Sequence, residues 1–312
     1  MAVGYGMTAL GLAWAASGKI SGAGDPDPNK NRVQRAAGWQ PYSIKVGDTW
    51  YSIKMIHPVG TLLGMTADIH DMAADMNKDE QDKALKLLGK AFSHAVTEQT
   101  FLQGMVNVVK ALNSPERGWN VFAQNMTASV VPASVSTLAQ MMDPYQRDVE
   151  SIRDAVMARL PGARESLMPQ RDPFGDPIAN ADRLGGISPI TERVESSDPV
   201  RLEAARLGIG VSAAPKSVQM PAARIHDLGK VELTAEQRDA FGDAAGHMAY
   251  KILAPIVNSD RWEGIPDTIK AQIFQTAFAK SRKFGELAAI TPEQRMAEMQ
   301  RISAEVSKRL GR

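Results

Sequence analysis

Residues 234–257 read TAEQRDAFGDAAGHMAYKILAPIV and give the clearest helix signal in the chain. Thr234 followed by Gln237 is the pattern of a capping box, in which each side chain bonds the other's backbone N–H, and apolar residues follow at helical spacing. Thr291 opens a second stretch with the same pattern, and Pro266 begins a third amphipathic stretch between the two. Three such stretches in succession predict a C-terminal helical bundle over residues 233–312.

Proline density marks the region before this bundle. Residues 161–232 hold eight of the 18 prolines in the chain, at Pro161, Pro169, Pro173, Pro177, Pro189, Pro199, Pro215 and Pro221. Proline removes a backbone donor and interrupts helices, so we expect a Pro-rich irregular strap with one short helix capped by Asp198-Pro199. Apolar residues at intervals favour a strap anchored on the protein over a disordered linker.

Region 25–160 is expected to hold a β-hairpin followed by helices. Apolar residues alternate with polar ones on both sides of Gly47-Asp48 within 42–56, which is typical of two strands joined by a two-residue turn. Two strands alone are marginal in water, so the hairpin must lie against helices or another chain. From Leu62 onward the apolar period becomes helical, with one long helix over 85–109 and another expected to start at Asp143-Pro144.

The N-terminal region 1–24 is predicted to be an apolar helix. No charged residue precedes Lys19, yet the run is slightly short for a bilayer-spanning helix, and the absence of an early positive charge disfavours a cleavable signal. A loop or linker should follow over 22–31, where prolines break the helix. An uncharged helix of this kind is either buried in the protein or packed on a partner, or it contacts a membrane. The predicted interaction residues are Tyr5, Leu10, Leu12 and Trp14, with Trp39, Tyr42, Trp50 and Tyr51 near the hairpin. For these last four the favoured alternative is that they form the aromatic side of a hairpin core.

Composition excludes several classes of function. The 312 residues carry 36 Lys and Arg against 35 Asp and Glu, a net charge of +1, whereas dedicated nucleic-acid binders usually carry a clear basic excess. No specific nucleic-acid partner is therefore expected. With no cysteine, the chain has no disulfides, thiolate metal sites or cysteine nucleophiles.

Motifs for catalysis are not apparent in this sequence. There is no nucleophile elbow, phosphate-binding loop or zinc-protease motif, and the Gly208-x-Gly210 pattern follows a helical stretch instead of a strand. Asp68, Asp71 and Asp75, with His70 beside them, could share one helix face as a hard-metal site, but a solvated face is the favoured interpretation. We therefore predict no catalytic, cofactor or metal residues, and a mainly α protein that is not an enzyme.

Several segments together resemble one family. These are GKISGAG over 18–24, AGWQPYSI over 37–44, the Gly47-Asp48 turn, WYS over 50–52, LPG over 160–162, PQRDPFGDPI over 169–178 and VELT over 231–234. They resemble the C-terminal module of the large polyvalent proteins of tailed bacteriophages, over almost the whole chain. No catalytic residue of that family falls on a position of this sequence.

The resemblance implies an internal virion protein that is packaged in the capsid and ejected with the DNA into the host envelope. We would then expect other virion proteins as partners, a homo-oligomer, and contact with the host membrane. In such proteins catalytic domains, for example lytic transglycosylases, lie far upstream of this module. The alternative interpretation is a soluble helical adaptor, or a remnant of a larger phage enzyme polyprotein that carries a lytic transglycosylase.

Overall fold

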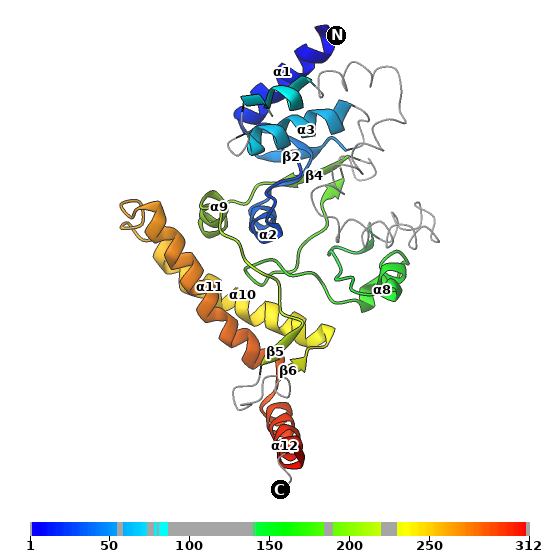
Figure 1. The fold of residues 1–312 in the computed structure, drawn as a ribbon, viewed down its shortest axis with the longest axis vertical. Coiled ribbons are helices and arrows are strands. Elements are labelled where there is room, and N and C mark those ends of the chain that lie inside the picture. The colour runs from blue at the N-terminus through cyan, green and yellow to red at the C-terminus, as the bar shows by residue number, and fades with distance from the viewer. Residues whose placement is uncertain are drawn as a thin grey trace. The chain divides into compact units, whose positions relative to one another are not determined.

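The computed structural model describes residues 2–54, 59–73, 78–79, 81–86, 140, 142–183, 190–219 and 230–309. In chain order its elements are α1 (Ala2–Ala16), α2 (Pro28–Ala36), β1 (Ser43–Val46), β2 (Thr49–Ser52), α3 (Val59–Met72), α8 (Ile152–Met157), the 3₁₀ turn η2 (Arg164–Ser166), β3 (Asp182–Arg183), β4 (Thr191–Val194), α9 (Pro199–Arg206), β5 (Ser217–Gln219), β6 (Lys230–Glu232), α10 (Ala235–Val257), α11 (Asp267–Ala289) and α12 (Pro292–Arg309). Helices predominate, which confirms the mainly α prediction (Figure 1). Most of the predicted helix over 85–109 lies outside the described residues.

The chain forms two compact units, each assembled from separate stretches. Unit 1 takes Met1–Asp27, Gly38–Ala133 and Ala181–Ser196, and unit 2 takes Pro28–Ala37, Ser134–Asn180 and Ser197–Arg312. The sequence had suggested consecutive regions instead.

Unit 1 contains the predicted hairpin, but in a larger sheet. Gly47 and Asp48 join β1 to β2, and the positive φ of Gly47 (61°) suits a tight hairpin turn. The sheet has four antiparallel strands in the order β1-β2-β4-β3. The predicted hairpin is present, but it is not the whole sheet: Trp50 of β2 pairs with Arg193 of β4, a strand far along the chain that the sequence did not identify. The partner strand satisfies the second edge of β2, which a hairpin alone would leave unpaired.

The core of unit 1 lies between its two described long helices and the sheet. α1 packs along α3 (Figure 1), and the buried side chains come from the end of α1, the loop after it, the residue that follows β2, and α3. They are Ala15, Ile20, Ile53, Leu62, Leu63 and Ala67. Burying this apolar surface stabilises the unit and fixes where α1 lies within it.

Unit 2 is organised around α10 and α11, which lie side by side in Figure 1. Its main core combines residues of both helices with α2, α9 and the 169–178 segment. Phe174, Leu253 and Phe274 are almost fully buried there, and the Trp262 and Phe274 rings meet at 6.0 Å. A second cluster beside it joins β5, the start of α10, the end of α11 and α12.

The predicted helix caps are confirmed. Thr234 and Gln237 bond each other's backbone N–H at the start of α10, and Thr291 and Gln294 do the same before α12. Asp198 accepts N–H bonds at the start of α9. These caps depend only on residues two or three positions apart, so the sequence could predict them.

Two predicted boundaries were wrong. No helix begins at Asp143-Pro144; α8 begins at Ile152, capped by Ser151, and the Asp143 carboxylate binds the Arg147 and Arg164 side chains as well as the N–H of Tyr145. The expected linker over 22–31 also contains the first turn of α2, which begins at Pro28. Proline is compatible with this position because the first helical N–H has no partner within the helix.

Candidate functional site

The apolar N-terminal segment forms α1, and one of its faces is covered within unit 1. Ala15 is buried, and Gly11 lies so close to α3 that an added Cβ would sit 2.4 Å from the Thr66 hydroxyl. On the opposite face Tyr5 and Leu10 are 44% and 42% exposed. In the part of the chain that the structure describes, no helix combines the length and apolar character needed to cross a bilayer.

The other six predicted interaction residues lie at different depths of unit 1. Trp50 is only 6% exposed, so its ring belongs to the interior and not to a contact surface. The remaining five are half-buried: Leu12, Trp14, Trp39, Tyr42 and Tyr51. Trp14 and Tyr42 pack against the same buried cluster. The eight residues therefore do not form one exposed aromatic surface.

Tyr42 occupies an unusual backbone position next to a half-buried carboxylate. Its φ is 52°, the left-handed region that a bulky residue rarely adopts, and a Cβ added to Gly64 would meet its ring at 2.4 Å. The Tyr42 side chain lies within the electrostatic influence of Asp68, whose carboxylate accepts the N–H of Ala23. Burial raises the pKa of Asp68 to about 6, although the bond from Ala23 opposes the rise. Burial, together with the Asp68 charge, raises the pKa of Tyr42 to about 12.

The three aspartates considered as a metal site do not share one environment. Asp68 is half-buried and bonded to Ala23, whereas Asp71 is exposed and lies 3.3 Å from His70 Nδ1. Asp75 lies outside the described residues. Within the described ranges, no three carboxylate or imidazole side chains are grouped so that they could hold a metal ion.

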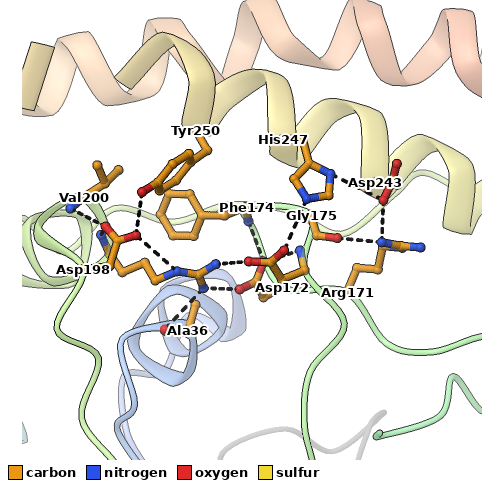
Figure 2. Close-up of polar contacts among 12 residues, drawn as sticks. Ala36, Arg171, Asp172, Phe174, Gly175, Asp198, Val200, Asp243, His247 and Tyr250 are labelled. Carbon is orange, nitrogen blue, oxygen red and sulfur yellow. Dashed lines mark hydrogen bonds and ion pairs between the residues drawn. The ribbon is translucent and has the colours of Figure 1, made fainter. Parts of the chain in front are cut away.

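A charged cluster in unit 2, which the sequence analysis did not identify, surrounds the 169–178 segment (Figure 2). Arg201, in the first turn of α9, forms ion pairs with Asp172, Asp176 and Asp198. Asp172 also accepts N–H bonds from Phe174 and Asp176 at 2.8 and 3.0 Å, which folds the segment back on itself. Burial by itself would lower the pKa of the Arg201 guanidinium. The carboxylates around it outweigh this effect, so the pKa lies above its usual value.

Phe174 anchors this segment in the core. Its ring contacts Tyr250 of α10 edge-on at 6.2 Å and Phe278 of α11 at 5.6 Å. The Arg201 guanidinium carbon lies 5.0 Å from the Phe174 ring centre, in the position of a cation–π contact. The Tyr250 hydroxyl donates to Asp198 at 2.7 Å, so the ring that packs on Phe174 also holds the α9 cap.

The other end of the cluster holds the segment to α10. Arg171 binds Asp239 with two nitrogens and Asp243 with a third contact at 2.6 Å, and hydrogen bonding to Asp239 raises its pKa. His247 lies between Asp176 and Asp243, 3.2 and 3.4 Å from their carboxylates. The charged groups of this cluster are held by one another, so the arrangement acts as a clamp that fixes the segment on α9 and α10.

The PQRDPFGDPI segment stands out in the sequence, but its residues alone do not identify these ion pairs. An Arg followed by Asp in one loop is a signal for a charged cluster, but the partners lie on α9 and α10. Comparison of the chain with models of known families, with curated proteins and with solved structures gives no match.

Proposed function

We propose that this chain is a non-enzymatic structural component of tailed-phage particles, ejected with the DNA and acting through contacts with other chains or with the host membrane. The resemblance to the large polyvalent module supports the phage assignment through the segments quoted above. The exposed face of α1 supports the mode of action, and it is the observation that carries the proposal.

This face of α1 consists of apolar and small residues without any charge. Its exposed members are Tyr5, Gly6, Ala9, Leu10, Ala13 and Ala16. The opposite face is already used within unit 1. An uncharged exposed face of this kind is typical of an interaction site, and its small central residues let another helix approach closely.

The proposal also includes the finer features of the fold. In it, the C-terminal helices form a bundle and the Pro-rich stretch acts as a strap, so that the chain can unfold and refold during passage through a narrow portal. The absence of cysteine is compatible with this, because no disulfide would have to break. Within the virion the chain would assemble with copies of itself and with other virion proteins.

The direct test is to find the chain in particles. Phage induced from cells that encode the protein would be purified on a density gradient and analysed by quantitative mass spectrometry. We expect several copies per particle. A phage preparation in which other structural proteins are abundant and this chain is absent would contradict the proposal.

A second experiment tests the contact face itself. Ala13→Glu places a charge in the centre of the exposed face and leaves the buried face of α1 unchanged. We expect it to weaken self-association in sedimentation, or flotation with anionic lipid vesicles, at least tenfold. Leu287→Glu is the matched control, because it adds the same charge at an exposed apolar position of α11. If both variants associate like wild type, α1 is not the contact face.

A further inference from the structure

Unit 2 contains a pocket of about 300 Å³ beside the Phe174 anchor. Helices α2, α10 and α11 and the 210–214 segment surround it. Arg32 of α2 and Arg282 of α11 both line it. The volume is at the lower end of the range for small-molecule sites.

Neither arginine has a carboxylate partner within ion-pair distance among the described residues. Arg32 donates to the carbonyl oxygens of Val211 and Arg171 at 3.1 and 3.0 Å. The guanidinium carbon of Arg282 lies 5.2 Å from the centre of the Phe241 ring. Arg171 and Arg201 of the same unit are, by contrast, bound to carboxylates.

The two charges are close enough to affect each other. Burial lowers the pKa of Arg32, and the charge of Arg282 lowers it further, while the Asp172 carboxylate opposes the change. Asp172 also lines the pocket, but it is bound to Arg201 and to two backbone N–H groups. The negative charge of Asp172 is already balanced by Arg201, so the two other arginines leave the pocket positively charged. An anion bound there would reduce the repulsion between Arg32 and Arg282.

We propose that this pocket binds a small organic anion, a carboxylate or a phosphate ester, between Arg32 and Arg282. Guanidinium groups bind both kinds of anion through paired N–H donors. The Phe241 and Phe278 rings and Val211 supply apolar walls for the rest of the ligand. An inorganic ion alone would leave most of this volume unfilled, which favours an anion with an apolar part.

Isothermal titration of the full chain tests the site with four probes: phenyl phosphate, benzoate, inorganic phosphate and neutral benzyl alcohol. We expect phenyl phosphate or benzoate to bind, and the stronger of the two identifies the anionic group. Benzyl alcohol should not bind. If wild type binds none of the anions at millimolar concentration, the proposal is wrong. Equal affinity for inorganic phosphate and phenyl phosphate would overturn the assignment to an organic anion.

Arg282→Gln is the informative variant, because its contact with Phe241 contributes less to the fold than the two carbonyl bonds of Arg32. We expect at least tenfold weaker binding in this variant. Lys283→Gln, at an exposed position of the same helix, should bind like wild type. Unchanged binding by Arg282→Gln would overturn the proposal. If that variant does not fold, the Arg32 Nε–H resonance of the wild-type protein decides: it must shift with added anion.

Discussion

The half-buried carboxylate of Asp68 accepts the backbone N–H of Ala23, and this bond joins the segment after α1 to α3. The pKa of Asp68 rises from 3.8 to about 6 on folding, so the folded chain holds this proton more tightly than the unfolded chain. The contribution of Asp68 to the unfolding free energy is therefore largest below pH 4 and falls as the pH rises to 6.

We expect Asp68→Asn to remove this dependence. Between pH 4 and 6.5 the unfolding free energy of wild type, relative to the variant, should fall by on the order of 2 kcal/mol. Urea unfolding across this pH range measures the difference. Asp71→Asn is the control, since Asp71 is exposed on the same helix, and its difference from wild type should not vary in this way. A constant difference for Asp68→Asn would show that its carboxyl ionises normally in the folded protein.

Trp50→Ala should destabilise unit 1 by about 3 kcal/mol or more, because it leaves a cavity under the sheet. The Nε1–H of Trp50 has no hydrogen-bond partner among the described residues, so the loss comes from packing. Tyr51→Ala is the control, because it truncates the half-buried neighbour on the same strand, and it should destabilise unit 1 clearly less. Chemical unfolding compares the two. An unfolding midpoint close to wild type for Trp50→Ala would instead assign Trp50 to an external contact.

Asp143→Ala should lower the free energy of unfolding by about 3 to 5 kcal/mol, because it leaves two guanidinium groups without their buried counter-ion. Asp143 binds Arg147 at 2.8 Å and Arg164 at 2.6 Å, and its own side chain is 1% exposed. These arginines hold the pKa of Asp143 well below its usual range.

The control for Asp143 is the surface pair of Glu298 and Arg301. The Arg301 side chain of this pair is exposed, so Glu298→Gln should lower the free energy of unfolding by less than about 1 kcal/mol. Both variants are compared by urea unfolding at pH 7. Similar losses in the two variants would mean that the Asp143 cluster contributes no more than an ordinary surface ion pair.

Gly175→Ala should loosen the clamp on α10. Gly175 has a φ of 96°, and an added Cβ would lie 2.8 Å from the Asp243 carbonyl oxygen and the His247 backbone nitrogen. Gly162 also has a positive φ, 79°, but open space around it. Gly162→Ala should therefore lower the free energy of unfolding only by its backbone strain, about 1 to 2 kcal/mol. Gly175→Ala adds a steric clash to this strain and should lower it by at least twice as much. Equal costs in urea unfolding would show that the segment moves away from α10 easily.

The sequence by itself determined the local features of this protein. The caps at Thr234 and Thr291, the cap at Asp198 and the turn at Gly47-Asp48 were all predictable. Each involves hydrogen bonds between residues at most a few positions apart, so residue type and spacing are sufficient to specify it.

Tertiary structure decided which distant groups meet. A strand edge offers the same backbone donors and acceptors to any partner, so nothing in β2 indicated that β4 would pair with it. Asp143 before a proline has the pattern of a helix cap and does accept the N–H of Tyr145, yet no helix follows, and packing brings the charged donors Arg147 and Arg164 to the same carboxylate. The arginine pair of the pocket has the same origin: Arg32 and Arg282 approach only because α2 and α11 pack on one core.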